Sequence, residues 1–119
     1  MTFSIASHFD QLYSCPTCDR DQLKRNADFD VRTWTCVARH QPVRIEISDR
    51  GGNSYHVERR LVQQLLAGDQ LVYLRPGGRL DIGEVKASSP STGKCKRWFL
   101  AVELFGHDLI ELDSYVNIL

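Results

Sequence analysis

Three cysteines and one histidine near the start of the chain constrain its fold more than any other sequence feature. Cys15 and Cys18 are separated by two residues in YSCPTCDRDQ, and Cys36 and His40 are separated by three residues in TCVARH. The constellation reads C-x2-C-x17-C-x3-H. Thiols at such spacings can form a metal site, a disulfide or a redox pair, and each option requires a different local structure.

The compartment and the flanking residues help to separate these options. The segment MTFSIASHFD has no basic region and no apolar run of signal-peptide length, and a run of about 18 apolar residues occurs nowhere. We therefore expect a cytoplasmic protein without a membrane partner, in which a durable disulfide is disfavoured. A thioredoxin-type C-x-x-C lies between a strand and a helix, whereas the polar segment DRDQLKRNAD follows Cys18 here.

A metal site fits the spacing better. Two thiols on a tight turn, followed by a second pair of ligands about 12 to 20 residues later, are typical of zinc-binding loops. Pro16 presets the backbone for the first turn, and residues 29–33 alternate in polarity as a strand does. The constellation resembles a zinc ribbon. This resemblance implies a structural zinc ion held by Cys15, Cys18, Cys36 and His40.

The second half of the constellation departs from the commonest ribbon, because C-x3-H stands where a second C-x2-C is usual. The identity of the fourth ligand therefore stays open between His40, His8 and Cys95. Four protein ligands leave no open coordination position, so such a zinc ion would stabilise the fold rather than catalyse a reaction. The alternative is that Cys15 and Cys18 are small buried residues beside a turn.

The segment SYHVERRLVQQLLAGD is predicted to form a helix. Its apolar residues recur at helical spacing, as at Val57, Leu61 and Leu65, and a glycine follows the last of them. We expect an amphipathic helix over residues 53–67, with Arg59 on its solvent-facing side.

Short strands separated by turn signals follow this segment. They are expected at residues 71–75, 79–87, 97–105 and 108–112, with a last strand in VNIL. Strands packed so densely close best as a small barrel, and Gly83 within a strand is typical of a bulge or a sharp bend. The order of strands and turns over residues 68–119 resembles an SH3-like barrel, although no motif there is specific to one family.

Together these patterns predict one compact α+β, β-rich chain. It would consist of a zinc-ribbon-like part (residues 1–52), a connecting helix (53–67) and an SH3-like small antiparallel barrel (68–119). The alternating segment PVRIEIS is expected to be the last strand of the first part. The predicted core consists of Trp34, Ile45, Ile47, Leu61, Leu65, Val72, Leu74, Ile82, Val85, Leu100, Val102, Leu104, Ile110 and Leu112.

The charges are balanced in total but unevenly distributed. Fifteen basic residues offset fifteen acidic ones, which argues against generic binding to phosphates or membranes. Residues 86–97 contain four positive charges and no acidic residue, whereas residues 103–119 contain four acidic residues and no Lys or Arg. A partner could recognise this polarity.

The sequence contains no recognisable catalytic constellation. G-x-S-x-G, a phosphate-binding glycine loop with its lysine and H-E-x-x-H are all absent. Cys95 lies between Lys94 and Lys96, and neighbouring cations favour a thiolate, so its reactivity stays open. We expect a protein without enzymatic activity.

Two functional classes remain. The first is a zinc-stabilised protein-binding module, acting as an adaptor, an inhibitor or immunity-type protein, or a regulator of a larger complex. The alternative is an RNA- or single-strand-binding module that uses Lys94, Lys96, Arg97 and Trp98. The zero net charge favours a protein partner. An unpaired edge strand could also join two copies, so a homodimer stays open.

Overall fold

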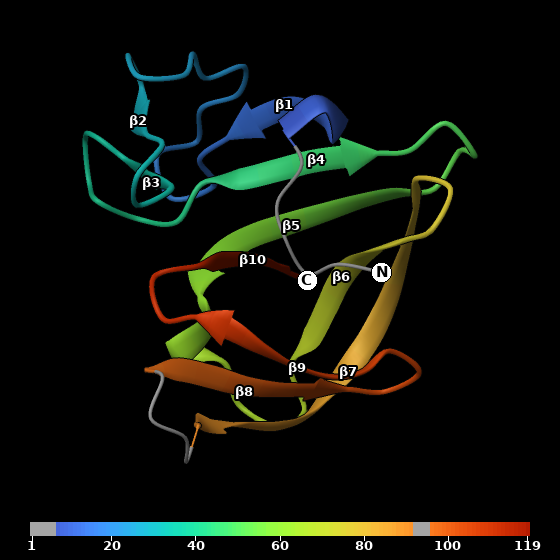
Figure 1. The fold of residues 1–119 in the computed structure, drawn as a ribbon. Coiled ribbons are helices and arrows are strands. Elements are labelled where there is room, and N and C mark those ends of the chain that lie inside the picture. The colour runs from blue at the N-terminus through green and yellow to red at the C-terminus, as the bar shows by residue number, and fades with distance from the viewer. Residues whose placement is uncertain (1–6, 92–95) are drawn as a thin grey trace.

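The computed structural model describes residues 7–91 and 96–119, which form an almost entirely β structure (Figure 1). Its main element is an antiparallel sheet of eight strands. In their order across the sheet, the strands are β1 (Asp10–Ser14), β4 (Arg44–Ser48), β5 (Ser54–Leu61), β10 (Tyr115–Ile118), β6 (Gln70–Arg75), β7 (Arg79–Pro90), β8 (Arg97–Val102) and β9 (Gly106–Glu111). A second sheet pairs β2 (Phe29–Asp30) with β3 (Thr35–Cys36).

Helical structure in this part of the chain is limited to two short 3-10 turns, η1 (Ser7–Phe9) and η2 (Val62–Gln64). A helix needs about 20 apolar residues to cross a bilayer. Within residues 7–91 and 96–119, no helix meets that requirement.

The predicted helix over residues 53–67 is wrong, and so is the α+β class. Residues Ser54–Leu61 form β5, in which Val57 lies opposite Ile45 of β4 and Arg59 lies opposite Asn117 of β10. Side chains alternate between the two faces of a strand. Arg59 shares the inward face with Val57 and is only 3% exposed. Because Arg59 is charged, the inward face of β5 does not read as apolar in the sequence. The helical spacing of the apolar residues is therefore the stronger pattern.

Residues 68–119, for which an SH3-like barrel is expected, form one continuous sheet with the strands that precede them. Strand β10 pairs with β6 on one side and with β5 on the other. The sheet therefore continues without a break from β6 through β10 and β5 into β4 and β1. Figure 1 shows β10 between β5 and β6. The strand that replaces the predicted helix provides the link, because β5 offers β10 a second partner.

Two clusters of buried side chains lie on opposite faces of the central strands. In β6, Val72 belongs to the first cluster, whereas Leu71 and Tyr73 belong to the second. The first cluster consists of Phe9, Cys15, Leu23, Phe29, Trp34, Cys36, Val43, Ile45, Ile47, Val57, Val72 and Leu80. The second consists of Val62, Leu65, Leu71, Tyr73, Val85, Leu100, Val102, Val116 and Ile118. The three cysteines that the structure describes thus adjoin only the first cluster.

Most of the predicted core is buried. The buried members are Trp34, Ile45, Ile47, Leu65, Val72, Val85, Leu100 and Val102. The half-buried members are Leu61, Leu74, Ile82, Ile110 and Leu112. Leu104 is the error: it is 76% exposed, because it lies in the turn between β8 and β9 with a left-handed φ of 65°.

Gly83 allows β7 to pass close to the segment that ends β8. A Cβ atom at this position would lie 2.5 Å from Val102 Cγ1 and 2.8 Å from the carbonyl oxygen of Glu103. Both distances are shorter than van der Waals contact, so the absence of a side chain here is a packing requirement. The irregular register between β7 and β8 lies slightly further along, between Val85 and Ala87.

Candidate metal centre

Cys15, Cys18 and Cys36 meet beside the β2–β3 sheet and lie close enough to hold a metal ion. Their Sγ atoms all lie within 4.8 Å of one another, and the Sγ atoms of Cys18 and Cys36 are 3.7 Å apart. With Zn–S bonds of about 2.3 Å, sulfurs in a tetrahedral site lie about 3.8 Å apart. Cys15 and Cys36 are buried and Cys18 is half-buried, so one side of the cluster faces the surface.

The first thiol pair is carried by a tight loop directly after β1. The backbone N–H of Cys15 donates to the carbonyl of Arg20 over 2.8 Å, and the N–H of Arg20 donates back to Cys15 over 3.2 Å. Asp19, four residues after Cys15, has a left-handed φ of 52°. This reversal of the chain turns Cys18 back toward Cys15.

A second loop of related geometry carries Cys36 at the end of β3. The N–H of Cys36 donates to the carbonyl of Gln41 over 2.9 Å, which matches the Cys15–Arg20 bond in spacing. His40, four residues after Cys36, has a left-handed φ of 54°. The N–H of Arg39 also donates to Cys36 Sγ over 3.4 Å. The two loops therefore hold the N–H of their first cysteine in the same way, whereas the carbonyl of that cysteine accepts from Arg20 in the first loop and from His40 in the second.

The structure brings together three of the four predicted ligands. Among the described His, Cys, Asp and Glu residues, none adds a fourth ligand atom to the group within 4.8 Å. His40 is exposed on its loop, and His8 lines a surface hollow with Asp49 and Arg50. Cys95 lies outside the described residues. Ligation by His40 stays a prediction.

Cys18 and Cys36 lie in different electrostatic surroundings. Burial raises the pKa of Cys36, but backbone N–H groups of Gln41 and Arg39 and bonds from the other thiols outweigh it and lower the pKa to about 7. The hydrogen bond with Cys15, followed by burial, raises the pKa of Cys18 to about 11. Without a metal, Cys36 is therefore the thiol most readily ionised of these two.

A buried polar network fixes the segment that carries the thiols, residues 15–42, to the main sheet. We call this segment the cysteine lobe. Arg59 Nη2 and Nη1 donate to the two carboxylate oxygens of Asp10 over 2.6 and 3.0 Å, and Arg59 Nε donates to Asn117 Oδ1 over 2.9 Å. The guanidinium carbon lies 4.2 Å from the centroid of the Trp34 ring, a cation–π contact with the lobe. The Tyr13 hydroxyl donates to Asp10 over 2.6 Å.

Sequence reasoning missed this network. The sequence pattern predicts Arg59 on a solvated helix face, yet its side chain and that of Asp10 are 0% and 2% exposed. Burial and the hydrogen bond to Asp10 raise the pKa of Tyr13 to about 12. The signal available in the sequence was the position of Arg59 in the alternation that includes Tyr55 and Val57.

The predicted nucleic-acid run is only partly available for binding. Arg97 forms an ion pair with Glu111 at 3.4 Å. Trp98 is half-buried against the second cluster, and its Nε1 donates to Ser88 Oγ over 2.8 Å. Lys96 is exposed, and Lys94 lies outside the described residues. A half-buried and hydrogen-bonded indole is a poor platform for stacking a base.

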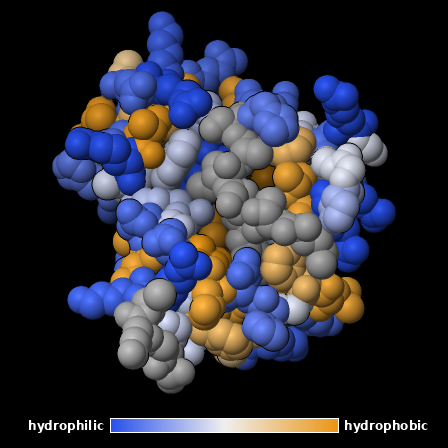
Figure 2. Space-filling model, viewed as in Figure 1, coloured by the Kyte–Doolittle hydropathy of each residue, from blue (hydrophilic) through white to orange (hydrophobic). Residues whose placement is uncertain are grey.

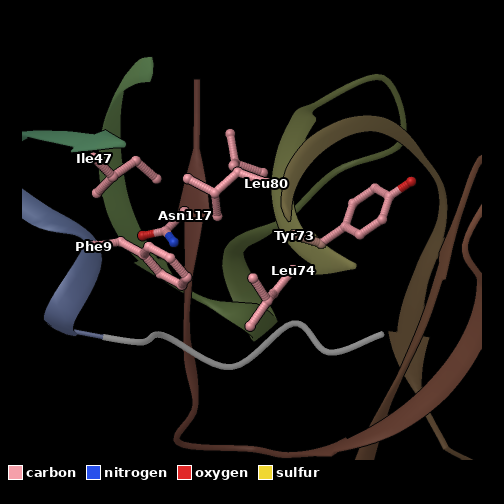
Figure 3. Close-up of a pocket in the computed structure, with 7 residues that line it drawn as sticks. Phe9, Ile47, Tyr73, Leu74, Leu80 and Asn117 are labelled. Atoms are coloured by element: carbon pink, nitrogen blue, oxygen red, sulfur yellow. The ribbon is translucent and has the colours of Figure 1, made fainter. Parts of the chain in front are cut away.

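Among the described residues, the enclosed cavity is too small for a ligand, and two larger hollows of about 490 and 440 Å³, which share Arg50 and Gly77, are open to solvent. The pocket in Figure 3 has a volume of about 10 Å³, roughly the space of one water molecule. Phe9, Ile47 and Leu80 line it, while the Tyr73 ring points away from them. Drug-sized ligands need several hundred cubic ångströms of enclosed volume.

The fold and the site define a β-sheet protein with a three-cysteine cluster suited to metal binding. Compared with protein-family models, with curated proteins and with solved structures, the chain matches none.

Proposed function

We propose that Cys15, Cys18 and Cys36 hold a structural zinc ion and that the protein is a non-enzymatic binding module. The sulfur spacing supports zinc, because 3.7 Å between Cys18 and Cys36 is close to the edge of a zinc–thiolate tetrahedron. The burial of Cys15 and Cys36 in the first cluster supports a structural role. An ion bound there contributes its binding free energy to folding.

Native mass spectrometry before and after strong chelation tests the metal. The full chain should carry one zinc ion, which Cys15→Ala, Cys18→Ala and Cys36→Ala should each lose or bind weakly. Thr35→Ala, next to Cys36, is a matched control that should keep the ion. A protein that is metal-free as purified, takes up no added zinc and still folds would rule out the zinc proposal.

The proposed binding role rests on β9, which is an exposed strand at the edge of the sheet. It pairs only with β8 among the described strands, so its other edge is open to a further strand, although the N–H of Leu109 already donates to Asp108 Oδ1. Five of its six residues are exposed, including Leu109. Glu111 is neutralised by Arg97, whereas Asp108 and Asp113 form no ion pair with any described residue. An extended segment with basic side chains would satisfy both the edge and its charge.

Apolar surface accompanies this edge. Leu109 is 45% exposed and Leu104, in the turn before β9, is 76% exposed. In Figure 2, hydrophobic residues lie among hydrophilic ones over the lower part of the molecule, where Figure 1 places β7, β8 and β9, and others lie at its upper left. Apolar contacts beside the acidic edge would give a partner buried surface area, and the charges would fix the register in which its strand pairs with β9. We therefore propose that the function of this protein is to bind another protein.

Affinity capture with the full chain as bait, followed by quantitative mass spectrometry, tests this role. A partner should be retained by the wild type and lost by the double variant Asp108→Lys, Leu109→Lys. Leu66→Lys is the matched control, because Leu66 is 70% exposed outside β9. Retention by the β9 variant would argue against this edge. Capture that disappears with ribonuclease and falls steeply with salt would favour the nucleic-acid alternative instead.

A further inference from the structure

The two cysteine-bearing loops can be compared position by position. Each begins with a cysteine whose N–H donates to the carbonyl five residues later, at Arg20 in the first loop and Gln41 in the second. Each has a left-handed residue four positions after that cysteine, Asp19 and His40. The third position after the cysteine is therefore the same place in both loops.

This comparison shows which residue of the second loop stands in the ligand position. In the first loop the third position is Cys18, whose sulfur reaches the cluster. In the second loop the third position is Arg39, which has no metal-binding atom. His40 matches Asp19, whose side chain does not join the cluster in the first loop. The C-x3-H spacing therefore places its histidine one residue beyond the ligand position.

The side chain of Arg39 lies across the two loops at the surface. Its Nη1 donates to the carbonyl of Thr17, between the two cysteines of the first loop, over 3.5 Å. Arg39 and Thr17 are exposed, and Cys18 is the half-buried thiol of the three. The guanidinium group thus lies beside the loop segment that joins Cys15 and Cys18.

We propose that the metal has three ligands from these loops and a fourth position open to a thiolate from outside the chain; this rests on the proposed zinc site. A divalent ion with three thiolates has one net negative charge, which the nearby Arg39 offsets. A fourth thiolate would bring the ion and its ligands to two net negative charges, and the guanidinium group of Arg39 would lower the electrostatic cost of the second one. An incoming thiol would replace a water molecule at the metal and release its proton to solvent.

Cobalt substitution tests the proposal, because the absorption of Co²⁺ reports the number and type of its ligands. The full chain is loaded with Co²⁺ under a phosphine reductant and titrated with 2-mercaptoethanol or with imidazole. Mercaptoethanol should raise the sulfur-to-cobalt absorption by about one third, because a fourth thiolate joins three. Imidazole at equal concentration should change the spectrum much less.

Three variants locate the fourth position. His40→Ala and Cys95→Ser should leave the starting spectrum and the response to mercaptoethanol unchanged. Arg39→Cys should show four-thiolate absorption without added thiol and should no longer respond. If Arg39→Cys fails to fold, as judged by circular dichroism, the other two variants and the titration still decide.

The outcomes separate this proposal from the one on which it rests. A change of the starting spectrum in His40→Ala or Cys95→Ser would show that this residue is the fourth ligand. It would contradict the proposal that the fourth coordination position is open. If the spectrum of the wild type does not respond to mercaptoethanol, or responds more strongly to imidazole, the proposal that the fourth ligand is a thiolate is wrong. Failure to bind either Zn²⁺ or Co²⁺ would instead remove the metal proposal itself.

Discussion

The guanidinium group of Arg59 shows how a buried charge can connect distant parts of this chain. It lies between Asp10, Asn117 and the Trp34 ring, which belong to β1, β10 and the cysteine lobe. A buried ion pair adds little stability compared with well-packed apolar residues, but losing one partner leaves an unpaired charge in the interior. The network therefore fixes the arrangement of three segments more than it adds net stability.

Arg59→Ala should lower the free energy of unfolding by about 3–5 kcal/mol, because the carboxylate of Asp10 then stays buried without its counterion. Urea denaturation followed by circular dichroism measures this change. Arg60→Ala is the matched control: its partner Glu58 is partly exposed, and we expect a loss of at most about 1 kcal/mol. Equal losses in the two variants would contradict the importance of the network.

Asp49 should make stability depend on pH in the acid range. The side-chain amide of Asn53 and the backbone N–H of Leu80 donate to its carboxylate and lower its pKa from 3.8 to about 2. A lowered pKa in the folded state gives stability that is complete above pH 3.8 and is lost as the pH falls toward 2. Asp49→Asn should therefore show a shallower loss of stability between about pH 4 and pH 2.

Thermal denaturation at a series of pH values checks this dependence. Asp113→Asn, which removes an exposed acidic residue from the turn before β10, controls for the change in net charge. If both variants follow the wild-type curve, the hydrogen bonds of Asp49 do not govern the acid transition.

At the scale of elements, local patterns were predictable and long-range ones were not. The cysteine spacing indicated a cluster because each loop is closed by hydrogen bonds within six residues, as between Cys15 and Arg20. The strands β4, β6, β7, β8 and β10 lie close to their predicted positions because their apolar residues alternate.

The helix prediction failed because the apolar residues of segment 53–67 are compatible with the periodicity of a helix and with that of a strand. Val57, Leu61 and Leu65 fit a helix as well as they fit a strand followed by a turn. What decides between them is the partner of Arg59, and Asn117 and Asp10 lie 58 and 49 residues away in the sequence. No local pattern contains that information. The fourth ligand is a similar case, since spacing alone does not show which loop position faces the cluster.

Metal removal should loosen the cysteine lobe before the rest of the sheet. The described cysteines adjoin the first cluster, whereas the second consists of strands β6 to β8, β10 and the η2 segment. Structural zinc contributes on the order of 10 kcal/mol of apparent binding free energy at neutral pH. After chelation, hydrogen exchange measured by mass spectrometry should accelerate most in residues 15–42 and least in β8. Uniform acceleration along the chain would show that the ion supports the whole fold equally.

At the scale of the whole molecule, the two clusters share strands β6 and β7, so they should unfold together. The chain has two tryptophans, Trp34 in the first cluster and Trp98 against the second. In the zinc-loaded protein, Trp34→Phe and Trp98→Phe leave one fluorescent reporter on each side. Urea transitions of the two variants, each compared with circular dichroism of the same variant, should coincide within that variant. A fluorescence midpoint that differs from that of circular dichroism would show that the two clusters unfold separately.

The position of β10 has a consequence for how the chain is made. β10 follows all other strands of the sheet in sequence, yet it lies between β5 and β6. During synthesis β5 and β6 therefore emerge with unpaired edges, which stay open until residues 115–118 arrive. Contacts so far apart in sequence slow folding, and open edges are sites of aggregation. The nascent chain should thus be most dependent on chaperones just before its two halves are joined.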